Sequence, residues 1–251
     1  NDKVSKLDSI YLLLYTELLA GNWLNIGNKA QEYYQAIQNN LERCQCPMRN
    51  QAEVISITSP LAYLKDDLVG NRWLTNQLAK LFQEAVRKRF NQVTIESQKP
   101  KDVNKKLNIG YIAHTLRRHS VGFLSRWLIH YHQRDNFNIH LYLVNQVEDD
   151  ITEQWFKNKV DKYDNLPANP QIIAEQINQD NIDILVDLDS ITKDTTCGVM
   201  AIKPAPIQIT WLGLDATGIP AIDYFLIDNL VLEKNAQEFY QEKLWCLPNC
   251  Y

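Results

Sequence analysis

Glycine is scarce in this sequence, at 8 of 251 residues or roughly 3%, where an average protein has about 7%. The scarcity excludes a collagen-like or linker-like chain and favours helices and long strands. Long apolar runs are also missing: the longest, such as residues 10–15, fall far short of the about 20 residues that a helix needs to span a bilayer. We therefore expect no transmembrane segment.

A disulfide framework and an excess of positive charge are missing as well. The five cysteines, at positions 44, 46, 197, 246 and 250, show no CxxC spacing, which predicts thiols in a reducing compartment. The first residues carry no secretory signal pattern, so we expect a cytoplasmic protein. Lys and Arg total 26 against 30 Asp and Glu, a net charge of −4. This balance argues against nucleic acid or a membrane surface as a partner and restricts any anion site to a local feature.

The first 96 residues have the apolar spacing of amphipathic helices. A polar stretch at 97–106 follows, which is typical of a linker. We predict an α-helical region over 1–96, made of repeat-like or transition helices, and a second domain over 97–251. The expected helices cover residues 7–18, 23–37 and 73–86.

Beyond residue 106, short apolar runs alternate with helical segments, which is the pattern of an α/β fold. Right-handed crossovers between such strands give a mostly parallel sheet, so we predict a Rossmann-like lobe. The expected strands cover residues 107–113, 137–144, 182–188, 206–212 and 224–227, and the expected helices cover 121–132, 151–160 and 170–179.

The loop after the first expected strand carries a candidate anion site, because ligands of open α/β sheets bind beyond the carboxyl ends of the strands. Arg117, Arg118 and His119 directly precede a helix N-terminus, where free N–H groups and the helix dipole favour an anion. A phosphate site is one interpretation, and a solvated basic loop with Ser120 as the helix N-cap is the other. The loop lacks the GxGxxG pattern, which argues against a nicotinamide or flavin cofactor.

Two further loops carry candidate residues. Asp187 and Asp189 end an apolar strand at i, i+2 spacing, which places both carboxylates on one side and suits either acid/base chemistry or the start of a turn. Residues 211–220 contain Gly213 and Gly218, and they form either a close backbone approach to a ligand or a tight turn.

Metal and nucleophile signatures are weak. His130 and His132 lie on different faces of their expected helix, and Cys44 and Cys46 have no second cysteine pair, so no metal is expected. Cys197 has no evident base partner and the sequence has no GxSxG motif, which argues against a hydrolase of that kind.

Several segments together resemble one family. KPAPIQITWLG at 203–213, GIPAIDY at 218–224 and EKL at 242–244 are similar to O-GlcNAc transferase and SPINDLY-type glycosyltransferases. LNIGYIAHTLRRH at 107–119 resembles the first strand and histidine-bearing loop of that family, and IDILVDLDSIT at 182–192 resembles a later strand and turn. The resemblance covers most of the chain and is strong after residue 107.

The resemblance implies one lobe of a GT-B enzyme, in which two Rossmann-like lobes, usually preceded by tetratricopeptide repeats, hold a nucleotide sugar between them. It implies transfer of GlcNAc from UDP-GlcNAc, or of fucose in some SPINDLY proteins, to Ser/Thr hydroxyls of an acceptor protein, with inversion and without a metal or other cofactor. The main nucleotide contacts would lie in a second lobe beyond these 251 residues, and this fragment alone would be inactive.

The resemblance assigns a catalytic role to His119, which would position the donor and give electrostatic or proton-transfer help. It places substrate binding on eight residues of the three loops and their flanks: Arg117, Arg118, Ser120, Asp189, Thr192, Gly213, Thr217 and Gly218.

The sequence departs from the family pattern at three places. Thr115-Leu116 stand where the family has Asp-Phe, which removes a carboxylate proposed as a base; Ser190-Ile191 replace small or polar residues; and the loop at 213–217 is one residue shorter. The sequence therefore does not decide the identity of the substrate. Two alternative functions remain: a helical-repeat protein-interaction module that has lost catalysis, and a small-molecule α/β enzyme with its own pocket.

Overall fold

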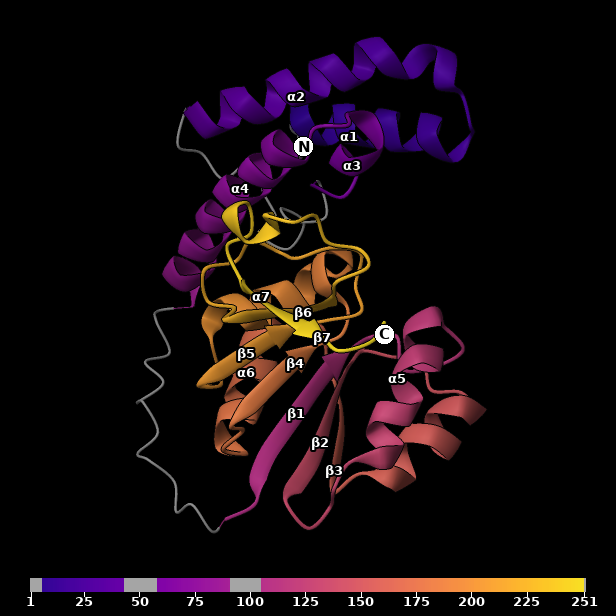
Figure 1. Ribbon diagram of the computed structural model, residues 1–251, viewed down its shortest axis with the longest axis vertical. Coiled ribbons are helices and arrows are strands. Elements are labelled where there is room, and N and C mark those ends of the chain that lie inside the picture. The colour runs from indigo at the N-terminus through magenta and orange to yellow at the C-terminus, as the bar shows by residue number, and fades with distance from the viewer. Residues whose placement is uncertain (1–5, 43–57, 91–104, 251) are drawn as a thin grey trace.

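A layer of helices lies at one end of an α/β lobe (Figure 1). The structure, a computed structural model, describes residues 6–42, 58–90 and 105–250. All three helices predicted for the first part of the chain are present. The helices of this layer are α1 (Lys6–Leu19), a 3-10 turn (Trp23–Asn25), α2 (Ile26–Glu42), α3 (Leu61–Leu64) and α4 (Leu68–Arg89).

The first two helices form a hairpin because the chain reverses at Gly21. This residue has φ +66°, a left-handed backbone conformation that glycine adopts without strain. Leu14 of α1 and Tyr33 and Ile37 of α2 are fully buried between the helices, and Leu78 of α4 belongs to the same core. The apolar spacing in the sequence is thus the contact face between these helices.

The lobe is built on one seven-stranded parallel sheet, which confirms the predicted Rossmann-like fold. Its strands are β1 (Leu107–Ala113), β2 (Phe137–Val144), β3 (Lys162–Leu166), β4 (Ile184–Asp187), β5 (Ile207–Thr210), β6 (Tyr224–Asp228) and β7 (Lys243–Leu247). The strand order is β3-β2-β1-β4-β5-β6-β7. The order reverses between β1 and β4, so a crevice is expected where the loops after these two strands diverge.

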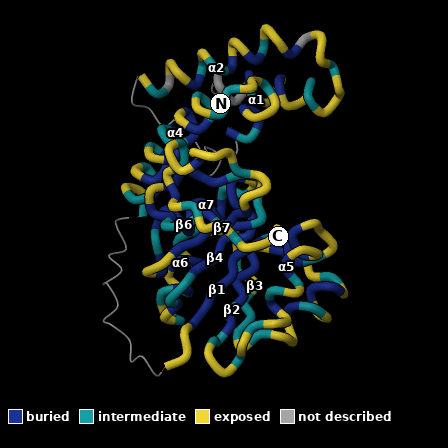
Figure 2. The backbone as a smooth tube through the Cα atoms, in the orientation of Figure 1, coloured by how far each residue is buried: buried dark blue, intermediate teal, exposed yellow. Residues whose placement is uncertain are grey.

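Helices cover both faces of the sheet. The lobe contains α5 (Ser120–Tyr131), α6 (Pro170–Gln179) and α7 (Asp194–Ile202). Residues of α6, α7 and the second half of α4 form one apolar cluster, and residues of α5 with Ile151 and Phe156 form another. Between the two clusters the central strands are buried, as the dark blue segments of Figure 2 show.

Four elements differ from the sequence-based prediction. The edge strands β3 and β7 were not expected, because a strand at the rim of a sheet is half-exposed and needs no apolar run. Helix α7 was not expected either, since it is buried on nearly all sides and has no amphipathic pattern. The helix predicted at 151–160 is instead a π-helical turn (Thr152–Phe156) followed by a 3-10 turn (Lys157–Lys159).

Helix α4 belongs to both parts of the molecule. Leu74 and Leu78 lie in the core of the helical layer, whereas Phe82 and Val86 lie in the apolar cluster of the lobe. The boundary predicted between residues 96 and 97 stays a prediction. Most of the predicted linker at 97–106, and the cysteines at 44 and 46, lie outside the described residues. Within the described part of the chain, no helix is both long and apolar enough to cross a membrane.

Candidate active site

The loops predicted to carry function meet at the carboxyl edge of the sheet. Residues 114–119 follow β1, residues 188–193 follow β4, and residues 211–223 follow β5. Because β4 pairs with both β1 and β5 in parallel, all three loops leave the sheet at the same edge. The arrangement follows from the strand order.

Asp189 joins the first two of these loops. Its side chain is fully buried and accepts three hydrogen bonds from the loop after β1. The donors are the backbone N–H of His114 (2.7 Å), the hydroxyl of Thr115 (2.6 Å) and ring Nδ1 of His114 (2.9 Å). Asp189 therefore holds the His114 side chain in place and does not itself face solvent.

Asp187 lies two residues earlier and is also fully buried. Burial raises the pKa of the Asp187 carboxyl well above its usual range, and the neighbouring charge of Asp189 adds to the shift. One oxygen of Asp187 accepts the backbone N–H of Asp189 (3.0 Å). Both carboxyls are fully buried, so neither is placed to contact a substrate directly.

His119 is exposed at the start of α5 and caps the helix. Its ring Nδ1 accepts the backbone N–H of Val121 (3.3 Å). Partial burial of the ring lowers the pKa of His119, and the charges of His114 and Arg117 act in the same direction. The expectation that Ser120 caps the helix is wrong, because Ser120 is the first helical residue and His119 takes the capping position.

The two arginines before His119 differ in their contacts. The Arg118 guanidinium forms an exposed ion pair with Asp150 (2.6 Å) on the outside of the lobe. Within the described residues, the half-buried Arg117 side chain has no hydrogen bond or ion pair. Arg117 is therefore the cation of this loop that is free to meet an anion.

Gly213 lets the loop after β5 lie directly on the turn after β4. A Cβ at this position would stand 2.0 Å from Cβ of Ser190 and 2.6 Å from the carbonyl oxygen of Asp189, which no side chain tolerates. The Ser190 hydroxyl donates to the carbonyl oxygen of Asp215 and fastens the same contact. Thr192 is exposed, and its hydroxyl closes the β4 turn by donating to the Asp189 carbonyl oxygen (2.5 Å).

Thr217 and Gly218 donate hydrogen bonds to a buried carboxylate, that of Glu242. The Thr217 hydroxyl (2.9 Å) and the Gly218 N–H (2.7 Å) both donate to Oε1 of Glu242, and Thr217 is fully buried. Gly218 also has φ +73° and lies against Asn76 of α4. These contacts account for a threonine and a glycine at these positions without a substrate. The substrate-binding role of Thr217 and Gly218 stays a prediction.

Arg72 of α4 lies beside the buried Glu242. The sequence analysis did not predict a role for Arg72. Its guanidinium pairs with Asp215 (3.1 Å), donates to the Ala216 carbonyl (2.9 Å) and stacks on the Tyr240 ring at 4.4 Å. One of its nitrogens lies 3.9 Å from Glu242. The helical layer thus holds the β5 loop through an ionic contact.

His114 was also missed as a site residue. The rule that strand-end residues face the crevice singles out His114, which directly follows β1, but the sequence does not show its contact with Asp189.

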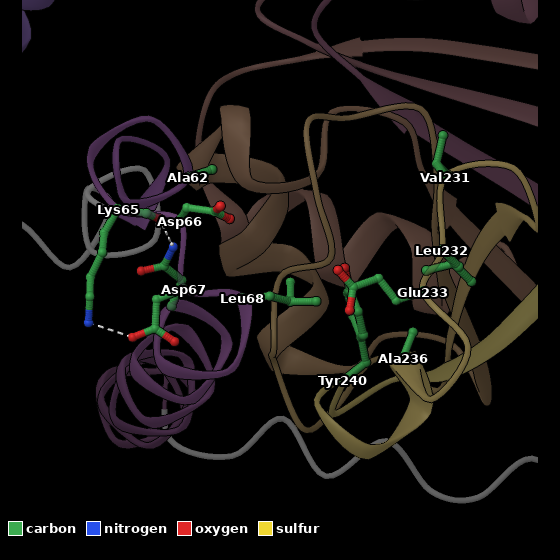
Figure 3. A pocket seen from close by; sticks show the side chains of 11 residues that line it. Ala62, Lys65, Asp66, Asp67, Leu68, Val231, Leu232, Glu233, Ala236 and Tyr240 are labelled. Atoms are coloured by element: carbon green, nitrogen blue, oxygen red, sulfur yellow. Dashed lines mark hydrogen bonds and ion pairs between the residues drawn. The ribbon is translucent and has the colours of Figure 1, made fainter.

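A pocket of about 430 Å³ lies at a different place, between the segment before α4 and the loop after β6 (Figure 3). Asp66, Asp67 and Glu233 line it together with Lys65, whose charge is paired with Asp67 (2.5 Å). An acidic lining repels a diphosphate. We therefore place the candidate active site at the histidine loop and not in this pocket.

The geometry agrees with comparisons to known proteins. A model of glycosyl transferase family 41 matches residues 22–251. The chain is 32% identical over 157 residues to a probable UDP-N-acetylglucosamine–peptide N-acetylglucosaminyltransferase SPINDLY of Arabidopsis thaliana, covering 60% of this chain and 17% of that protein. It is 32% identical over 149 residues to the probable enzyme SEC of the same plant, covering 59% and 15%.

A solved structure has the same fold. An O-GlcNAc transferase mutant from Thermobaculum terrenum superimposes with a TM-score of 0.70 at 20% identity, over 98% of this chain and 51% of that chain. The chain spans less than a fifth of the length of the two plant relatives. The match of the family model includes most of the helical layer as well as the whole sheet. The chain belongs to glycosyl transferase family 41.

Proposed function

We propose that this chain is the first catalytic lobe of an inverting glycosyltransferase that moves GlcNAc from UDP-GlcNAc to Ser/Thr hydroxyls of proteins. The acceptor protein and the donor would meet at the carboxyl edge of the sheet, and a second lobe outside these residues would hold most of the nucleotide. We expect the reaction to need no metal, and the protein to act in the cytoplasm.

The observation that carries this proposal is the start of α5. His119 accepts a backbone N–H through Nδ1, so the neutral ring bears its proton on Nε2 and presents a donor to solvent. Arg117 adds a positive charge that has no ion-pair partner in the described part of the chain. A diphosphate leaving group gains negative charge as the sugar departs, and preorganised donors and cations stabilise that charge.

The test uses the full-length protein that contains both lobes. We expect turnover with UDP-GlcNAc. GDP-fucose is tested beside it, because the sequence does not decide which sugar is transferred. His119→Ala should lower kcat by about 10²–10³-fold, the usual effect of removing one such donor. The matched control is His130→Ala, an exposed histidine in the last turn of the same helix.

Two results would contradict the proposal: an intact protein that neither binds nor hydrolyses any nucleotide sugar, or a His119→Ala variant with wild-type turnover. The 251 residues alone should bind UDP-GlcNAc weakly or undetectably in calorimetry. Micromolar affinity would place the donor site within this lobe.

A protein-interaction module without catalysis is the alternative. Exposed apolar side chains on the helical hairpin favour it, since Leu19 is 73% exposed, Trp23 64% and Leu24 98%. Thr115 in place of a carboxylate agrees with it. An intact, folded protein without any turnover would support this alternative.

A further inference from the structure

The loop after β1 contains two histidines whose Nδ1 atoms have different hydrogen-bond partners. His114 and His119 lie close enough that the charge of His114 contributes to the lowered pKa of His119. His119 accepts a backbone N–H through Nδ1, whereas His114 Nδ1 faces the buried carboxylate of Asp189 (2.9 Å). The two rings therefore present different chemistry to the crevice.

The hydrogen bonds decide the tautomer of each ring. Each oxygen of Asp189 already accepts from a backbone N–H or a hydroxyl, so Nδ1 of His114 is the donor of the ring contact and Nε2 keeps its lone pair. In His119 the proton is on Nε2. His114 thus presents an acceptor, and His119 a donor. One histidine is suited to take a proton, and the other to bind an anion.

Asp189 acts as a hydrogen-bond acceptor next to His114. It accepts the Thr115 hydroxyl and the His114 backbone N–H in addition to the ring, so both oxygens are satisfied. Burial raises the pKa of the neighbouring Asp187 carboxyl well above its usual range. A fixed carboxylate behind a histidine orients the ring and stabilises the imidazolium that forms on proton transfer.

The outer nitrogen of His114 is open. The His114 side chain is 27% exposed, and within the described residues Nε2 has no hydrogen-bond partner. Thr115 directs its hydroxyl to Asp189 and so supports the carboxylate that holds the histidine. Asp189 faces the His114 ring, and the charges of His114, Asp189 and Arg117 all act on the nearby His119.

We propose that His114, oriented by Asp189, is the general base that accepts the proton of the acceptor hydroxyl. This inference rests on the proposed function. Nε2 of His114 takes the hydroxyl proton while the hydroxyl oxygen bonds to the anomeric carbon of the sugar. The bond from that carbon to the diphosphate breaks, and its electron pair leaves on the diphosphate. The imidazolium faces Asp189 until it passes its proton to water.

The experiment measures kcat, KM and donor affinity of the full-length enzyme across pH. His114→Ala should lower kcat by about 10²–10⁴-fold, the usual contribution of a general base, and leave the affinity for UDP unchanged. The fall of wild-type kcat/KM at acidic pH should disappear in this variant, because the ring whose protonation would block the base is gone. Added imidazole should restore part of the rate, which a merely structural role would not allow.

Two further variants separate the roles. Asp189→Asn should lower kcat while donor affinity persists, since an amide can hold the ring in the wrong tautomer. His119→Ala should differ from both, because it should weaken UDP binding in addition to lowering kcat. His130→Ala controls for the loss of any histidine.

The failures of the two proposals are distinguishable. If the wild-type enzyme is active and His114→Ala keeps its rate and its acidic limb, the base assignment is wrong and the proposed function stands. Loss of kcat without imidazole rescue and with an unchanged acidic limb would also overturn the assignment. If the wild-type protein transfers no sugar, both proposals fall.

Discussion

At the scale of single residues, two aspartates separated by one residue have different surroundings. Asp189 accepts hydrogen bonds from the loop after β1, whereas burial and the neighbouring Asp189 raise the pKa of Asp187. The spacing predicted a pair on one side of the strand, and the structure gives each member its own task. Asp187 supports the turn, and Asp189 orients His114.

Asp187→Asn tests the buried neutral carboxyl. Because the pKa of Asp187 is raised, the folded protein binds more protons than the unfolded chain, and its contribution to stability is lost as pH rises above the ordinary aspartate range. The asparagine keeps an oxygen for the Asp189 N–H but does not titrate. We expect the free energy of unfolding of the variant, relative to wild type, to increase between about pH 5 and about pH 8 in urea titrations.

The matched control is Asp135→Asn, which removes one negative charge from the surface. An equal difference between Asp187→Asn and wild type at both pH values would mean that Asp187 is ionised in the folded protein.

At the scale of elements, α4 holds the loop after β5. Arg72 contacts Asp215, the Ala216 carbonyl and the Tyr240 ring, and it faces the buried Glu242. Burial raises the pKa of Glu242, and the positive charge of Arg72 opposes that shift. The guanidinium therefore compensates a carboxyl that has no access to water.

Arg72→Ala should lower the free energy of unfolding by about 3–5 kcal/mol, because it leaves Glu242 buried without its cation. The measurement is a denaturant titration. Lys65→Ala, which breaks an exposed ion pair with Asp67 before the same helix, should cost less than about 1 kcal/mol. Similar losses in both variants would show that the Arg72 contacts are no stronger than a surface pair.

At the scale of the whole molecule, the helical layer and the sheet lobe share α4. Its first half packs in the core of the hairpin, and its second half packs on the sheet. An element common to two cores couples their stabilities. We expect the two parts to unfold together, although the sequence predicts two domains divided between residues 96 and 97.

Phe82→Ala tests this coupling. Phe82 is 1% exposed in the cluster of the lobe, and its removal should cost about 3–5 kcal/mol. Hydrogen exchange should show that α2 and β1 lose protection at one common denaturant concentration, lower in the variant than in wild type. Leu24→Ala, at a residue 98% exposed, is the control and should change stability by less than about 0.5 kcal/mol. Separate transitions of α2 and β1 would show independent domains.

Part of this architecture was predictable from local signals. The apolar runs of β1 and β2 are long and bounded by polar residues, and their predicted limits match the structure. Helix α6 begins where Asn169 caps it and Pro170 occupies its first turn, so its limits also match. The place of the His119 loop followed from the order of strand and helix alone.

The sequence by itself determined the alternation of strands and helices, and with it the parallel sheet and the edge at which function gathers. These features depend on hydrophobic periodicity and on near neighbours along the chain. Only the tertiary structure decided that Asp189 meets His114, 75 residues away, and that Arg72 meets Asp215, 143 residues away. The partner of a buried polar group is set by which distant segments the strand order brings together, and no local pattern carries that information.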